Sequence, residues 1–364
     1  MSVDVIRLGR QCWNGLPYLR KEIARDVSVL TGRVWTTPAS YYIIYGGRCN
    51  VDCPFCYVDK NRQPEISGPD MLRLLREAKE LSGSGFNISI TGGEPLIYEP
   101  IFDLLAEAQR LHLNFGFTTN GYTMTPETAR RVVAYDPFNI NFSIESVDAK
   151  VNEVLRPKKD GTRLTLAGIE NLIEAKRSAR ARVSIFVKAT IMEQNFRHLP
   201  ELVKFFSQWR EVQVALQPFT GLPGSPFLVK DVGELRRVFD ELLALRAAGC
   251  NLVADEETLN NFVEYFRRPP GQDGLRTLEL NGNKRNCDVG LRTMFIFRDG
   301  AVHFCEYLGK PIGSIYQDSL KRIYFGAEAD RQRRLMVTCN IDCQSTCKRR
   351  ISLWTKARAF LKMG

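Results

Sequence analysis

The sequence predicts an α/β fold, in which helices cover a parallel sheet, followed by a small cysteine-rich α+β domain. Three observations support this prediction. Between residues 38 and 220, apolar strand-like segments alternate with amphipathic helical segments through six βα units. Beyond residue 285, a hairpin pattern and short helices accompany five of the ten cysteines. Hydrophobic residues make up 44% and charged residues 25% of the 364 residues, as in an ordinary globular protein.

Six segments rich in β-branched and aromatic residues are expected to form the strands. They are residues 40–46, 86–90, 113–117, 138–144, 181–190 and 212–217. Apolar residues at helical spacing predict the helices, which are residues 70–81, 101–111, 126–134, 164–177, 199–209, 232–247 and 256–267. Thr125 is expected to cap the third of these helices. Because the strands run in parallel, their carboxyl ends meet at one edge, where βα folds place their chemistry.

Three cysteines stand in the loop that follows the first predicted strand: Cys49, Cys53 and Cys56. Three thiolates on one loop can hold a soft metal or an iron–sulfur cluster. A cubane has four irons, so three ligands leave one iron able to bind a reacting molecule. The alternatives are a zinc knuckle that lacks its fourth ligand and a chance grouping of small hydrophobic residues. No further Cys or His lies nearby in the sequence to complete a zinc site.

The C-x3-C-x2-C spacing, followed by the aromatic Tyr57, resembles the radical S-adenosylmethionine (SAM) superfamily. The resemblance implies a partial (βα)6, TIM-like barrel that is open on one side to admit substrate. It also implies that SAM chelates the open iron of a [4Fe–4S] cluster through its amino and carboxylate groups. The reduced cluster then cleaves SAM to methionine and a 5′-deoxyadenosyl radical, which takes a hydrogen atom from the substrate. An external electron donor of the flavodoxin or ferredoxin type is expected to supply the electron.

Residues at the ends of the second and third strands resemble the SAM-binding positions of this family. Gly92 and Gly93 let a backbone approach a ligand closely, and the carboxylate of Glu94 can accept hydrogen bonds from an ammonium group. Together they resemble the family's GGE motif, which contacts the SAM amino group. Asn120 lies in a Thr-Asn-Gly segment that resembles a recurrent family motif, although an ordinary turn explains it equally well.

Residues after the fourth strand extend the resemblance. Ser143 and Glu145 stand where the family carries a serine and an acidic residue near the SAM ribose. Arg156 resembles the arginine that meets the SAM carboxylate, although Pro157 replaces the more common glycine. The last polar residues of the fifth and sixth strands could face either the site or the solvent; they are Lys188, Thr190 and Gln217. The sequence assigns no side chain to the hydrogen-transfer step itself.

The C-terminal cysteines predict a second metal centre. Cys287 and Cys305 flank a hairpin pattern, in which Asp299 and Gly300 separate the apolar runs 294–297 and 302–305. This arrangement resembles SPASM and twitch domains, which carry auxiliary iron–sulfur clusters. A full SPASM domain has seven cysteines and two clusters, whereas here only three more follow: Cys339, Cys343 and Cys347. The resemblance implies one auxiliary [4Fe–4S] cluster, held by the first pair and two of these three; a zinc site is the alternative.

We expect five parts along the chain: residues 1–37 as a helical lead-in, 38–220 as the barrel, 221–284 as a helical bridge, 285–348 as the auxiliary-cluster domain and 349–364 as a basic amphipathic tail. Of the formal net charge of +10, the last 34 residues supply +8, with nine Lys or Arg against one Asp. Such a tail can meet an anionic substrate, a partner or a membrane surface, or it can be a solvated helix face. No specific nucleic-acid partner is expected.

The chain has no run of 18 apolar residues and no secretory signal, which predicts a cytoplasmic protein without a transmembrane segment. Cysteines in that reducing compartment favour metal binding over disulfides. None of the three histidines stands in a catalytic arrangement, so ordinary acid–base hydrolysis has little support.

Two substrate classes fit a radical SAM enzyme with one auxiliary cluster. The first prediction is oxidation or epimerisation of a small polar, sugar-like metabolite, because no separate peptide-recognition domain is evident. The alternative is a SPASM-type maturase that modifies a ribosomally made peptide or a protein side chain, and its basic tail would serve an acidic leader peptide. A cluster carrier without enzymatic activity would explain the cysteines but not Gly92, Gly93 and Glu94.

Overall fold

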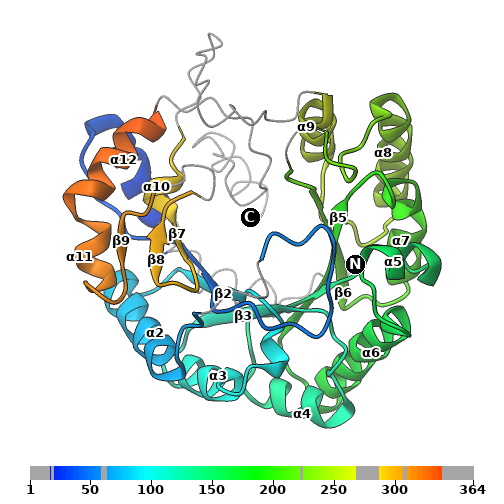
Figure 1. Ribbon diagram of the computed structural model, residues 1–364, viewed down its shortest axis with the longest axis horizontal. Helices are drawn as coiled ribbons and strands as arrows, with labels where there is room; N and C mark the ends of the chain where they lie inside the picture. The colour runs from blue at the N-terminus through cyan, green and yellow to red at the C-terminus, as the bar shows by residue number, and fades with distance from the viewer. Residues whose placement is uncertain are drawn as a thin grey trace, which may run out of the picture.

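The computed structural model describes residues 17, 20–58, 64–221, 224–267, 287–305 and 310–337. Nine strands within these residues form one sheet in the order β6-β5-β4-β3-β2-β1-β7-β8-β9. The strands from β6 to β7 are parallel, and β7, β8 and β9 pair in the antiparallel sense. The sheet curves into an open ring with the helices outside it (Figure 1). The predicted α/β fold with a partial barrel is therefore confirmed.

The six predicted strands of the barrel are present, with ends that differ by a few residues from the sequence prediction. They are β1 (Ser40–Ile44), β2 (Asn87–Thr91), β3 (Asn114–Thr119), β4 (Asn139–Ser143), β5 (Ser184–Ile191) and β6 (Val212–Pro218). In β5, Ile185 and Val187 are fully buried, whereas the alternating Lys188 and Thr190 are only half-buried. This two-residue period places apolar side chains against the outer helices and polar ones on the concave face.

The remaining strands are β7 (Thr293–Ile296), β8 (Ala301–His303) and β9 (Gly313–Ser314). The predicted hairpin is present as β7 and β8, in which Phe295 pairs with His303. An unforeseen feature is that β7 pairs in parallel with β1, with Ser40 opposite Thr293. The C-terminal hairpin is thus a continuation of the barrel sheet.

All seven helices that the sequence analysis lists by range are present, as α2 (Gly68–Ser82), α3 (Ile101–Arg110), α4 (Pro126–Ala134), α6 (Gly161–Ala179), α7 (Leu199–Phe206), α8 (Val232–Ala247) and α9 (Glu256–Arg267). The structure also has α5 (Ala149–Leu155), α10 (Val289–Arg292), α11 (Leu320–Tyr324) and α12 (Ala327–Val337), with the short 3-10 helices η1 (Pro95–Ile97) and η2 (Phe196–His198). Thr125 caps α4 as predicted, by accepting a hydrogen bond from Thr128 N. None of the helices in the described residues is long and apolar enough to cross a bilayer.

A buried group of charges joins the N-terminal helix, residues 20–31, to the C-terminal hairpin. Arg25 Nε lies 2.8 Å from Asp288 Oδ2, and these side chains are only 3% and 1% exposed. Arg292 Nη2 lies 2.9 Å from the other oxygen of Asp288, and Glu22 pairs with Arg25. Asp288 directly follows Cys287, so this ion pair fixes the chain beside a predicted cluster ligand.

Replacing Arg25 with leucine is expected to lower the free energy of unfolding by about 3–5 kcal/mol, because it leaves Glu22 and Asp288 buried with less compensating charge. Urea denaturation of the whole chain measures the loss. Arg331→Leu is the matched control, since its pair with Glu328 is solvent-exposed and should contribute less than about 1 kcal/mol. Equal effects of the two substitutions would show that the buried group does not hold the N-terminal helix.

Candidate active site

A cavity lies at the carboxyl ends of β1 to β4. It brings together segments that are up to about a hundred residues apart in the sequence, because the ends of neighbouring parallel strands meet at one edge. Its lining includes most of the predicted cluster and SAM-binding residues: Cys49, Cys53, Cys56, Tyr57, Gly92, Gly93, Glu94, Asn120, Ser143 and Arg156. Among the predicted SAM-binding residues, Glu145 is not part of the lining.

The cysteine loop follows β1 and reaches across the cavity. Cys49 and Cys53 are half-buried, Cys56 is exposed, and Cys56 N donates a hydrogen bond to Cys53 O at 3.1 Å. Tyr57 is 72% exposed. No three potential ligands among the described side chains stand close enough to hold a single metal ion, whereas the three thiols line one cavity. This arrangement fits a larger iron–sulfur cluster better than a zinc knuckle.

Gly92 and Gly93 allow the loop after β2 to pack against the cysteine loop. Gly93 N donates to Gly46 O at 2.9 Å, and Glu94 N donates to Arg48 O at 2.8 Å. A Cβ atom on Gly93 would stand 1.6 Å from Arg48 O, and Gly92 has a φ of +137°. The sequence predicted that these two glycines let the backbone approach a ligand closely. In the structure they let the loop after β2 approach the backbone of the cysteine loop, and both loops line the cavity.

Glu94 is buried and accepts three hydrogen bonds. Thr119 Oγ1 donates to Glu94 Oε1 at 2.6 Å, Leu96 N donates to the same oxygen at 3.0 Å, and Asn120 N donates to Oε2 at 2.7 Å. Burial raises the pKa of the Glu94 carboxyl, and these hydrogen bonds oppose the shift. A carboxylate has about four acceptor sites, so one remains for an ammonium group in the cavity.

Asn120 connects the third strand to the cysteine loop. Its side-chain amide donates to Asn50 Oδ1 at 2.6 Å, and its Oδ1 accepts a hydrogen bond from Tyr122 N at 3.0 Å. Because Asn50 stands next to Cys49, the Thr-Asn-Gly segment is more than an ordinary turn: it braces the predicted cluster loop.

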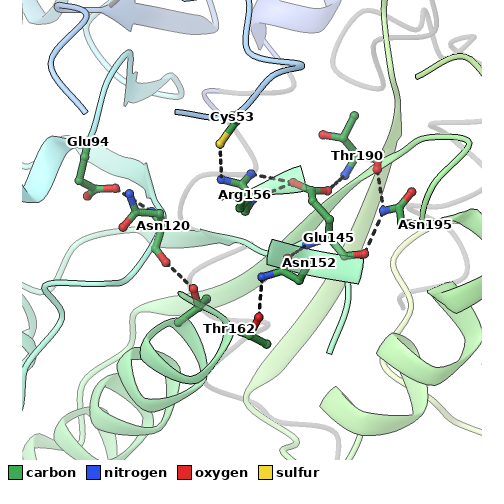
Figure 2. Close-up of polar contacts among 10 residues, drawn as sticks. Cys53, Glu94, Asn120, Glu145, Asn152, Arg156, Thr162, Thr190 and Asn195 are labelled. Carbon is green, nitrogen blue, oxygen red and sulfur yellow. Dashed lines mark hydrogen bonds and ion pairs between the residues drawn. The ribbon is translucent and has the colours of Figure 1, made fainter. Parts of the chain in front are cut away.

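Glu145 and Arg156 form a buried ion pair beside the cavity (Figure 2). Glu145 Oε1 accepts hydrogen bonds from Arg156 Nη2 at 2.7 Å and from Nε at 3.0 Å, and Oε2 accepts one from Thr190 N at 2.6 Å. Both oxygens of the Glu145 carboxylate thus accept hydrogen bonds from groups of the protein itself. A direct contact of Glu145 with the SAM ribose stays a prediction.

Arg156 also reaches the cysteine loop. Its Nη1 lies 3.8 Å from Cys53 Sγ, and its guanidinium stands 5.6 Å from the ring centre of Phe55. Burial alone would lower the pKa of Arg156, but Glu145 and the Cys53 sulfur raise it above its usual value, so the guanidinium remains charged. Three polar side chains that the sequence did not single out hold this pair in place: Asn152, Thr162 and Asn195.

The predicted residues outside the cavity have varied positions. Lys188 and Thr190 are half-buried and Gln217 is exposed; none of the three lines the cavity. Cys305 is buried just after β8, and Cys287 is half-buried just before α10. The other three predicted ligands of the auxiliary cluster lie outside the described residues: Cys339, Cys343 and Cys347. The basic tail of residues 349–364 lies outside them too.

Residues 43–206 match the family model of the radical SAM superfamily. The chain belongs to this superfamily. Residues 287–349 of this radical SAM protein match the SPASM model, an iron–sulfur cluster-binding domain. These matches confirm the predicted family and the predicted cofactors, which are SAM, its [4Fe–4S] cluster and an auxiliary [4Fe–4S] cluster.

Curated relatives of this radical SAM protein have several activities. The mycofactocin maturase MftC of Mycolicibacterium smegmatis is 27% identical over 148 residues, which is 40% of this chain and only 37% of that maturase. The AdoMet-dependent heme synthase of Nitratidesulfovibrio vulgaris is 21% identical over 87% of this chain and 86% of that protein. The chain therefore matches less than two thirds of the length of the maturase.

Solved structures confirm the fold of the radical SAM protein. Streptococcus suis SuiB bound to SAM has a TM-score of 0.62 at 18% identity, covering 82% of this chain and 68% of SuiB. SuiB bound to its precursor peptide SuiA has a TM-score of 0.65 at 17% identity, covering 85% of this chain and 70% of SuiB.

Proposed function

We propose that the chain is a SPASM-type maturase that modifies a ribosomally made peptide or a protein side chain. The observation that carries this proposal is the similarity to a mycofactocin maturase in sequence, together with the shared fold of SuiB bound to a precursor peptide. These comparisons favour the second of the two substrate predictions over the sugar-like metabolite. The cytoplasmic location and a flavodoxin- or ferredoxin-like electron donor belong to the same proposal.

The cavity supplies groups for each part of SAM. Cys49, Cys53 and Cys56 would hold the cluster, which leaves one iron for SAM. Glu94 would accept a hydrogen bond from the SAM ammonium through its remaining acceptor site, and Arg156 would face the carboxylate. When bound, cluster and SAM together supply a radical that removes a hydrogen atom from the substrate.

The remaining site residues shape this pocket. Asn120 holds the cysteine loop through Asn50. Ser143, at the end of β4, and the exposed ring of Tyr57 complete the lining on which the adenosine part of SAM would rest. An auxiliary [4Fe–4S] cluster would be held by Cys287 and Cys305 with two of the three later cysteines.

A second candidate function is a step in the synthesis of heme. It is favoured by one specific observation: the match to the AdoMet-dependent heme synthase covers 87% of this chain, about twice the share that the maturase covers. Both functions use the same radical chemistry and differ in the substrate that enters the site.

Turnover of a defined peptide tests the first function. The reconstituted protein is incubated without oxygen with SAM, dithionite and the peptide whose gene neighbours its own. We expect a mass change in the peptide, together with 5′-deoxyadenosine in proportion, and no change in a peptide of shuffled sequence. An unmodified peptide, with 5′-deoxyadenosine formed on a heme precursor instead, would exclude the maturase and support the second function.

A further inference from the structure

The contact between Arg156 and Cys53 is not accounted for by SAM binding. Within the guanidinium, Nε and Nη2 donate to the carboxylate of Glu145, whereas Nη1 lies 3.8 Å from Cys53 Sγ (Figure 2). Because the guanidinium is planar, the hydrogen bonds of Nε and Nη2 to Glu145 fix the direction in which Nη1 points. Cys53 is the central cysteine of the three that line the cavity.

Glu145 is held from several sides, so it can hold Arg156 in turn. Its side chain is 1% exposed, and Thr190 N donates to its second oxygen at 2.6 Å. Its backbone N–H donates to Asn152 Oδ1, and its backbone carbonyl accepts a hydrogen bond from Asn195 Nδ2, both at 2.9 Å. Because Glu145 is held in one position, it keeps the guanidinium of Arg156 oriented toward the Cys53 sulfur.

The environment makes this contact strong. Arg156 is 9% exposed, so water screens its charge little. Its charge is permanent, because a guanidinium stays protonated in proteins. Hydrogen bonds to cluster sulfurs and nearby charges are among the factors that set the reduction potential of an iron–sulfur cluster.

We propose that Arg156, positioned by Glu145, raises the reduction potential of the cluster that Cys53 ligates with Cys49 and Cys56. Reduction adds one negative charge to the cluster, and a cation that donates toward a ligand sulfur stabilises this reduced form. This inference rests on the proposed cluster ligands. It goes beyond them by assigning Arg156 a role in electron entry, in addition to any contact with the SAM carboxylate.

The test is a redox titration of the holoprotein followed by electron paramagnetic resonance, without SAM and without substrate. In Arg156→Met, the equilibrium constant for reduction of this cluster should fall about tenfold, which is about 59 mV in the midpoint potential of a one-electron couple. Arg182→Met is the matched control, because Arg182 pairs with Asp136 on the surface and does not line the cavity. The control should keep the wild-type potential.

A second variant gives a shift of opposite sign. Glu145→Gln removes the negative charge of the pair but keeps a side-chain oxygen that can accept from Arg156 Nε and Nη2, so the midpoint potential should rise. Urea denaturation shows whether this variant keeps the stability of the wild type, and the variant decides the matter if Arg156→Met fails to load iron. Unchanged potentials in both variants, with weaker SAM binding in Arg156→Met alone, would overturn the proposal. Because the measurement uses no substrate, its outcome is independent of whether the chain is a maturase.

Discussion

A variant in which Cys49, Cys53 and Cys56 are all replaced with alanine is expected to lose the SAM cluster and all formation of 5′-deoxyadenosine. The wild-type chain, with two clusters, should hold about eight irons, and the variant should keep about four in the auxiliary cluster. The three thiols line the same cavity as Glu94 and Arg156, so no other described cysteine can replace them there. Iron analysis and product chromatography measure both quantities.

The control for this variant is Cys250→Ala. Cys250 is half-buried against the apolar core and does not line the cavity, so this substitution should leave iron content and 5′-deoxyadenosine unchanged. A wild-type content near four irons that disappears entirely in the triple variant would mean that the C-terminal cysteines hold no iron–sulfur cluster. Retention of all the iron by the triple variant would contradict the assignment of the three ligands.

Replacing Gly93 with alanine is expected to have the second-largest effect. The added Cβ atom would stand 1.6 Å from Arg48 O, and since that atom is backbone, the cysteine loop must move. Overpacking of this kind costs about 3 kcal/mol or more in the free energy of unfolding. The displaced loop should also lose most of the SAM cluster while the auxiliary cluster stays. Urea denaturation and iron analysis together measure the effect.

Gly233→Ala is the control for Gly93→Ala. Gly233 lies in the first turn of α8, where a Cβ atom would meet only Asp231 Oδ1 at 3.3 Å. Alanine is the better helix former, so this variant should be as stable as the wild type or slightly more stable. If Gly93→Ala behaved like this control, the packing between the two loops would not be what positions the cysteines.

The sequence predicted much of the site because its main motifs are local. Cys49, Cys53 and Cys56 follow one strand and Glu94 follows the next, so parallel pairing alone brings them to one cavity. The same reasoning placed Asn120 and Ser143 correctly at the ends of β3 and β4. Once the order of the parallel strands is known, the positions of these motifs relative to one another follow.

The pairing of Arg156 with Glu145 could not be predicted in the same way. It depends on α5, a helix of seven residues that ends just before Arg156 and that the sequence analysis missed. Its N-cap, Asp148, was the one local signal that could have revealed it. Asn152 and Asn195 contact the backbone of Glu145 from other segments of the chain. The spacing of residues in the sequence does not indicate that these segments come together.

The pairing of β7 with β1 was missed for a related reason. All four residues of β7 are buried, so the strand shows no alternation that would reveal which faces are covered. Its partner lies about 250 residues earlier in the chain, and pattern reasoning gives no means of choosing a partner at that distance. The buried ion pair of Arg25 with Asp288 joins equally distant segments.

The parallel pairing of β1 and β7 also separates the described cysteines of the two predicted metal centres. Cys49 follows the carboxyl end of β1, whereas Cys287 precedes β7 and Cys305 follows the antiparallel β8, at the opposite edge of the sheet. A strand of five residues spans roughly 15 Å, so Cys49 stands at one end of this hydrogen-bonded ladder and Cys287 and Cys305 stand at the other. Any electron that moved between centres held at these two ends would have to cross the length of the ladder through the protein.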